Sequence, residues 1–399
     1  MKIKDSNIKS SDDSKFSFIN MLAEFAARLV FHRVVIRNEL KGIKEPYILI
    51  CNHECALDPV LLLGLLPQTT TYVMSDQFYF TVPFKRLMKK RNIIHKLQFA
   101  TTLSDVKKMM GAVRKGSGGL VLFPAGLMCA DGKSTPLPKA TGQFIQFLNV
   151  PVYIARIYGS YFVQPKWSKR LHPGKTEVDI YRLFGAEELK QSSTEAVEQK
   201  IHNAIDFDAY REQERLRARC KNARNIEGLE NVLYRCPDCG EAYTVKVINR
   251  HTISCTSCGY TERADEYGFL HLVGDVGKEI RYASDWSRQI YLDLKAEIEK
   301  EPAFALSTPA DIRILNREAG RFESIGRGNV TLSREGFTVE SVAEGGFLIK
   351  ASTAGMPSLP VKPGKCFDIQ AGNEIYRCFP DDGRRAIQFV HITEIMYEL

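Results

Sequence analysis

The sequence lacks several features that would place it in a familiar class at once. None of its apolar runs reaches the roughly 20 residues that a membrane-spanning helix needs. Its first residues, MKIKDSNIKSSDDSK, lack the apolar centre of a secretory signal. It contains no internal repeat and no low-complexity tract. These absences argue against a helical membrane protein, a secreted protein and a repeat protein, and they predict a cytoplasmic location.

The composition is that of a folded protein with more than one domain. The chain has 399 residues, of which 44% are hydrophobic and 26% charged. A chain of this length is longer than one that usually folds around a single hydrophobic core, so two or three domains are expected. The formal net charge of +8 suits an anionic membrane surface, an anionic substrate or a nucleic acid equally well.

The first half of the chain alternates strand-like and helix-like segments. Apolar runs such as PYILICNH and GLVLFPAG are separated by helical patterns such as DPVLLLGLL and SDVKKMMGAVRKG. This alternation is typical of βαβ units. It predicts an α/β domain over residues 20–185, with a mostly parallel sheet and helices on both faces.

The second half changes character three times. Residues 186–230 are charged and favour helix, which predicts a helical linker. Residues 231–265 contain two CxxC pairs. Residues 300–399 have short alternating strands, Gly-rich turns and a helical end, which predicts a β-rich domain. That pattern would suit a PH- or GRAM-like domain, which often binds lipid or a partner protein.

The segment LICNHECALDPV combines a buried-type strand with a histidine and an acid. His53 follows the apolar run, and Asp58 precedes Pro59 at the start of the next helical pattern. Ligands bind at the carboxyl ends of parallel strands, so a carboxylate that folds back could orient the imidazole as a general base. The alternative is structural: Asp58 would be an N-cap before a proline at the first helical position.

A second segment, GLVLFPAGLMCADGKSTPLPKATGQF, and a third, VPVYIARIYGS, follow in order. Together with the NHECALD block, they resemble the glycerolipid (PlsC-type, 1-acylglycerol-3-phosphate) acyltransferase family. The family's N-H-x-x-x-x-D block corresponds to Asn52, His53 and Asp58. Three ordered blocks are a specific signal, whereas each block alone is weak. The residues that match its F-P-E-G block and the following turn and lysine are Phe123, Pro124, Gly126, Asp131, Gly132 and Lys139.

The resemblance implies transfer of a fatty acyl group from acyl-CoA or acyl-ACP to a hydroxyl of a lysophospholipid-like acceptor. By the same resemblance, His53 is the general base and Asp58 orients it. Partners would be a lipid acceptor, a membrane surface and an acyl carrier protein. The residues expected to bind substrate are Asn52, Phe123, Pro124, Gly126, Lys139 and Lys96.

The chain also departs from the family pattern. Ala125 stands where the family has glutamate, and Leu127 and Met128 stand where it has threonine and arginine. Only Lys96 is available where the family places an arginine after a strand. We therefore expect an acceptor other than lysophosphatidic acid. The alternative is a lipid-binding or regulatory protein that keeps the fold with little or no turnover.

Two segments are candidates for membrane contact. Residues 16–36 form an apolar helical pattern that includes Arg28 and Arg33, and such a helix could lie in the membrane interface. A basic set at residues 85–91 adjoins the aromatic segment QFYFTVPF. A helix packed on the sheet and a solvated helix face are the alternatives. The prediction is a peripheral protein on the cytoplasmic membrane face.

Four cysteines have the spacing of a metal site. Cys236 and Cys239 form one CxxC pair, Cys255 and Cys258 form another, and a glycine follows each pair. This spacing resembles a zinc ribbon with a structural Cys₄ zinc. His251 is the alternative ligand. Nucleic-acid binding is not expected because the intervening EAYTVKVINRHTIS has few basic residues. The remaining cysteines are expected to be buried: Cys51, Cys55, Cys129, Cys220, Cys366 and Cys378.

Overall fold

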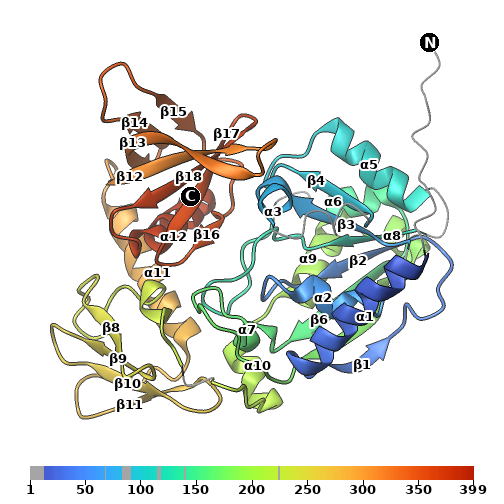
Figure 1. Cartoon of the computed structure of the whole chain (residues 1–399), viewed down its shortest axis with the longest axis horizontal. Helices are drawn as coiled ribbons and strands as arrows, with labels where there is room; N and C mark the ends of the chain where they lie inside the picture. Colours follow the sequence, from blue (N-terminus) through green and yellow to red (C-terminus); the bar gives the residue numbers. More distant parts are fainter. Residues whose placement is uncertain (1–12, 68, 83–90, 115–117, 139–140, 223–224) are drawn as a thin grey trace.

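The computed structural model describes residues 13–67, 69–82, 91–114, 118–138, 141–222 and 225–399, with the backbone alone for residues 13–20. The N-terminal part is a seven-stranded sheet of order β1-β7-β6-β2-β5-β3-β4 (Figure 1). All neighbouring strands are parallel except β6 and β7. The strands are β1 Val34–Asn38, β2 Tyr47–Cys51, β3 Thr71–Ser75, β4 Ile93–Lys96, β5 Gly119–Leu122, β6 Val152–Tyr158 and β7 Glu177–Phe184.

Helices cover both faces of this sheet. On β2, Leu49 and Cys51 join the core cluster that contains residues of α1 and α2. Ile48 and Ile50 join the cluster on the opposite face, with residues of α5, α6, α8 and α9. The predicted α/β fold is therefore confirmed. The helices are α1 Asp13–Leu29, α2 Asp58–Leu63, α3 Asp76–Thr81, α5 Leu103–Arg114, α6 Thr141–Leu148, α7 Ser160–Val163, α8 Ala186–Gln191, α9 Thr194–Ile205 and α10 Ala209–Leu216.

Two further sheets follow, joined by helix α11 (Ala283–Lys300). The first is antiparallel, with β8 Val245–Ile248, β9 Thr252–Cys255, β10 Thr261–Ala264 and β11 Leu270–Leu272. The second has the order β15-β14-β13-β12-β18-β17-β16 and ends in α12 (Arg385–Glu398). The β-rich C-terminal region is thus present, and its PH- or GRAM-like character stays a prediction. Its strands are β12 Ala305–Asn316, β13 Arg321–Ser333, β14 Gly336–Ser341, β15 Leu348–Ala351, β16 Val361–Lys362, β17 Cys366–Ala371 and β18 Glu374–Pro380.

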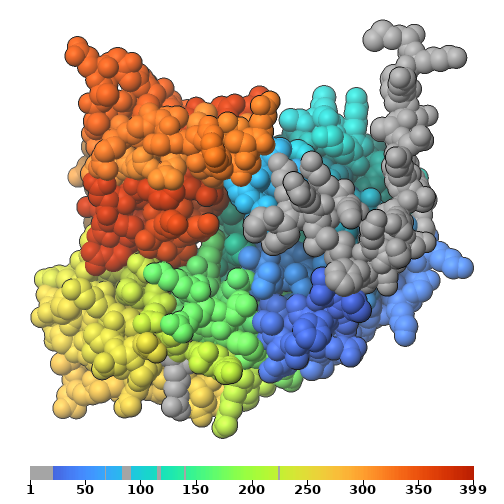
Figure 2. Space-filling view, viewed as in Figure 1, coloured from blue at the N-terminus to red at the C-terminus, as the bar shows by residue number. Residues whose placement is uncertain are grey.

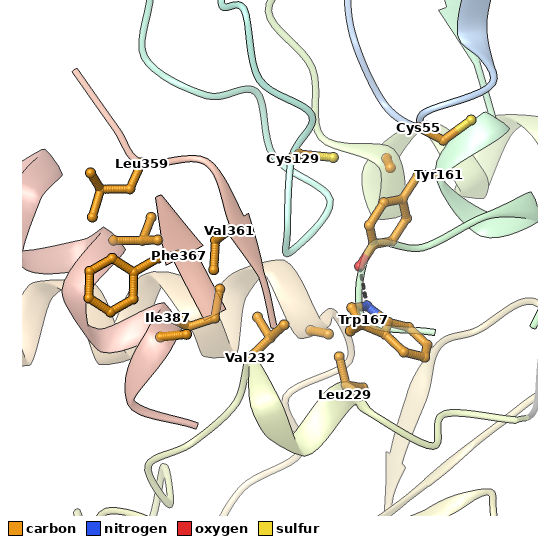
Figure 3. Packing of buried hydrophobic residues seen from close by; sticks show 14 of the residues in the cluster. Cys55, Cys129, Tyr161, Trp167, Leu229, Val232, Leu359, Val361, Phe367 and Ile387 are labelled. Atoms are coloured by element: carbon orange, nitrogen blue, oxygen red, sulfur yellow. Dashed lines mark hydrogen bonds between the residues drawn. The ribbon is translucent and has the colours of Figure 1, made fainter. Parts of the chain in front are cut away.

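One hydrophobic cluster runs through all of these parts. Figure 2 shows the four-stranded unit (yellow) and the C-terminal unit (orange to red) packed against the N-terminal part. Trp167, from the loop after α7, donates its indole N–H to Tyr161 at 2.9 Å. It lies beside Leu229 of the 3-10 turn η1 (Leu229–Asn231), and the cluster continues to Phe367 of β17 (Figure 3). The later units therefore share a core with the first sheet.

The N-terminal helix is shorter than the apolar pattern predicts. It ends at Leu29 rather than continuing to residue 36, because His32 has a left-handed φ of 40° and the β-branched run that follows forms edge strand β1. Arg33 leaves the helix face, donating Nη1 to the carbonyl of Leu61 at 2.7 Å and pairing with Glu24.

Neither candidate for membrane contact adds a spanning element. Across the portion of the chain that the structure describes, no helix combines the length and hydropathy required to cross a bilayer. Of the basic set at residues 85–91, only Arg91 lies within the described residues.

Candidate active site

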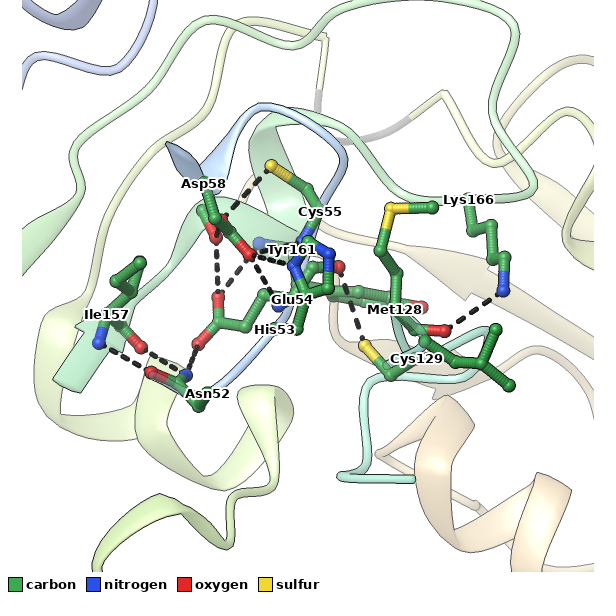
Figure 4. Close-up of polar contacts among 12 residues, drawn as sticks. Asn52, His53, Glu54, Cys55, Asp58, Met128, Cys129, Ile157, Tyr161 and Lys166 are labelled. Carbon is green, nitrogen blue, oxygen red and sulfur yellow. Dashed lines mark hydrogen bonds and ion pairs between the residues drawn. The ribbon is translucent and has the colours of Figure 1, made fainter. Parts of the chain in front are cut away.

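The carboxyl ends of three adjacent strands bring the predicted site residues together. Asn52 and His53 follow β2, whose neighbours are β5 and β6. The side-chain amide of Asn52 donates to the carbonyl of Ile157 at 2.7 Å and accepts from its N–H at 2.8 Å (Figure 4). Asn52 therefore links the end of β2 to β6 and fixes the position of the backbone from which the His53 side chain projects.

His53 and Asp58 form the predicted pair. Nδ1 of His53 lies 2.8 Å from Oδ2 of Asp58. The Asp58 side chain is fully buried, whereas the His53 side chain retains 17% exposure. The imidazole packs against the ring of Phe123 with centroids 4.5 Å apart. Since Nδ1 is engaged, Nε2 is the ring nitrogen that remains for a substrate.

The Asp58 carboxylate faces back along the chain and does not cap its own helix. Oδ2 accepts the N–H groups of Glu54 at 2.7 Å and Cys55 at 2.9 Å. Oδ1 accepts the Ser160 hydroxyl at 2.6 Å. Helix α2 has Leu57 at its N-cap and no side-chain cap bond. A buried carboxylate needs such donors, and here they hold it toward His53.

Glu54 is a buried acid that the sequence did not single out. Its Oε2 accepts the backbone N–H of Tyr161 at 2.9 Å and lies 3.2 Å from the Ser160 hydroxyl. Burial, reinforced by the nearby Glu212 and Asp58, raises the pKa of Glu54 well above its ordinary value. This shift favours the protonated form of Glu54, which shares the Ser160 hydroxyl with Asp58. An acid inside the N-H-x-x-x-x-D block was the only sequence signal for it.

The third block forms a tight turn behind His53. The N–H of Gly126 donates to the carbonyl of Phe123 at 2.8 Å, and Gly126 has a φ of +66° that favours glycine. The carbonyl of Gly126 accepts from the side chain of Gln98. Lys96 instead donates to the carbonyls of Leu97 at 2.8 Å and Gln98 at 3.1 Å, and burial lowers its pKa. Gln98, which the sequence did not suggest, is thus one of the side chains that bond to this block; Lys166, which donates to the carbonyl of Met128 at 3.0 Å, is another.

A small cavity opens beside His53. Its volume is about 20 Å³, which is room for about one water-sized group. Neither Lys96 nor Phe123 is among its lining residues, and Lys139 lies outside the described residues. The predicted substrate-binding roles of these residues stay predictions. The lining residues are Cys51, Asn52, His53, Ala125, Leu127, Ser134, Thr135, Leu137, His202, Ile205, Asp206 and Phe207.

The four paired cysteines converge as their spacing predicts. Their sulfur atoms all lie within 4.8 Å of one another, with Cys236–Cys258 at 3.6 Å and Cys239–Cys255 at 3.8 Å. A tetrahedral zinc with Zn–S bonds of about 2.3 Å requires S···S distances of about 3.8 Å, so the residues fit this metal. His251 is not part of the cluster. The other six cysteines are buried, as predicted.

Comparisons with known proteins agree with the motifs. Residues 31–158 match the family described as Acyltransferase. A 1-acyl-sn-glycerol-3-phosphate acyltransferase from Cocos nucifera is 21% identical over 157 residues, which are 39% of this chain. The chain spans about half (51%) of the length of that relative.

Among solved structures, a similar one is the 1-acyl-sn-glycerophosphate (LPA) acyltransferase PlsC from Thermotoga maritima. The two chains are 19% identical, with a TM-score of 0.43. The match covers 52% of this chain and 84% of that chain.

The buried Glu54 predicts a pH effect on stability. Above the ordinary carboxyl pKa of 4.5, the unfolded chain releases this proton while the folded protein retains it up to the raised pKa. Stability therefore falls as pH rises through this window, by about 1.4 kcal/mol per pH unit for one proton. Glu54→Gln should flatten the plot of unfolding free energy against pH above 4.5, measured by denaturant titration.

The control is Glu195→Gln, which removes an exposed carboxyl from the first turn of α9. It should leave the slope as in the unmodified protein. Parallel pH curves for the Glu54→Gln variant and the unmodified protein would show that Glu54 is not held neutral.

Proposed function

We propose that this protein transfers a fatty acyl group from an acyl thioester to a hydroxyl of a lysophospholipid-like acceptor. The observation that carries the proposal is the 2.8 Å contact between His53 Nδ1 and Asp58 inside the acyltransferase domain. The Cocos nucifera relative, a 1-acyl-sn-glycerol-3-phosphate acyltransferase, supports the same acceptor class.

The chemistry follows from the orientation of the imidazole. With Nδ1–H donating to Asp58, Nε2 accepts the proton of the acceptor hydroxyl as its oxygen attacks the thioester carbonyl. The new C–O bond forms, the C–S bond breaks, and the imidazolium returns the proton to the departing thiolate. The Asp58 carboxylate holds the ring and stabilises its charge in between. The donor is acyl-CoA or acyl-ACP.

A second candidate is a lipid-binding protein that keeps this fold without turnover. It is favoured by Ala125 and Leu127 in the cavity lining, where the family pattern has polar residues. It is also favoured by the small cavity volume of about 20 Å³, which must widen before a lipid enters.

Substitution of the pair separates the two candidates. His53→Ala should lower kcat by about 10²- to 10⁴-fold, because the general base is lost. Asp58→Asn should also lower kcat strongly, because the imidazole loses the acceptor that orients it. The measurement is thioester consumption with acyl-CoA and acyl-ACP in the presence of lyso-lipids, with circular dichroism to verify folding.

The matched control is His95→Ala. His95 also places Nδ1 2.8 Å from a carboxylate, that of Asp76, but it does not line the cavity. This variant should keep most of the activity. Equal rates for His53→Ala and the unmodified protein would refute the base mechanism. No turnover by the unmodified protein with any acceptor would favour the lipid-binding candidate.

We also propose that Cys236, Cys239, Cys255 and Cys258 bind one structural zinc ion. Four thiolates complete a tetrahedral shell, so the metal would cross-link the two turns and have no position for substrate. Gly240 and Gly259, with φ values of 75° and 82°, permit these turns.

Metal analysis checks this proposal. Purified protein should contain about one zinc per chain, and Cys236→Ser with Cys239→Ser should abolish the zinc and destabilise residues 231–265. His251→Ala should retain the metal, because its ring lies outside the cysteine cluster. Metal-free protein of unchanged stability would argue against the site.

We propose, third, that the protein binds a membrane surface through α1 and the adjoining edge strand. Phe25 is 62% exposed, and Met21, Leu22 and Leu29 of the same helix are also exposed. Val34, Val35 and Ile36 of β1 extend the apolar surface, which is of the kind that marks interaction sites.

Vesicle flotation tests the membrane proposal. Phe25→Glu should reduce binding to vesicles that contain phosphatidylglycerol, because a charge enters the apolar face. Phe147→Glu is the control, since Phe147 is 54% exposed on α6, which packs on the opposite face of the sheet. Equal binding of both variants and the unmodified protein would place the contact elsewhere.

A further inference from the structure

The cavity beside His53 has room for a hydroxyl but not for the rest of an acceptor. Its volume is about 20 Å³, so a headgroup must lie at the mouth. Two exposed polar residues of the lining, His202 and Asp206, come from the end of α9. None of the three motif blocks contains them. The mouth is therefore formed in part by a segment that sequence comparison with the family did not assign to the site.

The end of α9, which forms one wall of the cavity, is held in place by packing and hydrogen bonds. Val197, Ile201 and Ile205 of α9 are buried in the core cluster on one face of the sheet. Arg156 of β6 donates Nη1 to the carbonyl of Ile205 at 2.9 Å and pairs through Nη2 with Glu212 of α10. A charged group that is buried and bonded in this way holds the end of α9 in one position.

The wall is also joined to the chain that follows the third block. The N–H of Ser134 donates to the carbonyl of Phe207 at 3.1 Å, and the N–H of Ala209 donates to the carbonyl of Gly132 at 2.8 Å. The hydroxyl of Ser134 donates to Oδ1 of Asp206. These bonds hold the backbone just after Asp206, and the Ser134 hydroxyl orients its carboxylate.

The charges at the mouth disfavour a bare phosphate. Among the described residues that line the cavity there is no lysine or arginine, and Ala125 and Leu127 contribute no polar group. Asp206 is exposed, and the described part of the chain provides it with no ion-pair partner. His202 lies in the last turn of α9, and its carbonyl accepts the N–H of the C-cap residue Asp206 at 2.8 Å. An imidazole and a carboxylate side by side complement a phosphodiester beside an ammonium group.

We propose that Asp206 determines acceptor specificity, selecting lyso-lipids whose headgroup carries an ammonium over those with a bare phosphate monoester. This inference rests on the proposed acyl transfer. A phosphate monoester brings up to two negative charges toward the Asp206 carboxylate and is repelled, whereas an ammonium is attracted to it.

The experiment compares kcat/KM for three acceptors of one chain length: lysophosphatidic acid, lysophosphatidylglycerol and lysophosphatidylethanolamine. The unmodified protein should prefer the ethanolamine lipid. Asp206→Asn should lower its kcat/KM for that lipid by about tenfold, the effect of about 1.4 kcal/mol, and should raise that for lysophosphatidic acid. Asp206→Lys should reverse the preference.

Two controls separate specificity from structure. Ser134→Ala removes the hydrogen bond to Asp206 but keeps its charge, so the order of acceptors should not change. Glu195→Gln removes the same charge from the exposed first turn of α9, away from the cavity, and should change no acceptor preference.

Each result has a defined meaning. An equal loss with all three acceptors in the Asp206 variants would reduce Asp206 to a structural role and overturn the inference while leaving acyl transfer intact. A preference of the unmodified protein for lysophosphatidic acid would also overturn it. Absence of turnover with every acceptor would overturn the proposed function itself, and this inference with it.

Discussion

The candidate site depends on one constraint, the burial of the Asp58 carboxylate. A buried carboxylate is tolerated only where donors replace its water, and here the donors are His53, two loop N–H groups, the Cys55 thiol and Ser160. These donors follow β2 and β6, so the strands must lie side by side for the carboxylate to be satisfied. The same bonds orient the His53 imidazole, so the stability of the fold and the position of this ring depend on the same contacts.

The segments after the first sheet share its hydrophobic core and do not form separate units. Leu229 and Phe367 belong to the core cluster that also contains Tyr161, directly beside Ser160 in α7. The end of α9 lines the cavity at Asp206. The region that matches the Acyltransferase family therefore has part of its core, and part of the lining of the candidate site, contributed by residues beyond its motifs.

Several features could be predicted because they rest on local patterns. Alternating apolar runs predicted the strands, and the CxxC spacing predicted the cysteine cluster through Cys236 and Cys258. The apolar pattern through residue 36 was misleading, because an edge strand and a helix with exposed apolar residues look alike in one sequence. The partner of the Gly126 carbonyl, Gln98, could not be predicted, because β3 lies between β4 and β5 in the sheet and only the path of the loop after β4 brings Gln98 to the third block.

By itself, the sequence determined the α/β class, the placement of His53 at a strand end and the thiolates that could hold a metal. Only the tertiary structure decided that Asp58 turns back to His53 instead of capping α2, that Glu54 lies buried beside it, and that Asp206 stands at the cavity mouth. The reason is physical: burial and charge environment arise from elements distant in the chain, and a linear pattern records spacing but not which strands and helices meet.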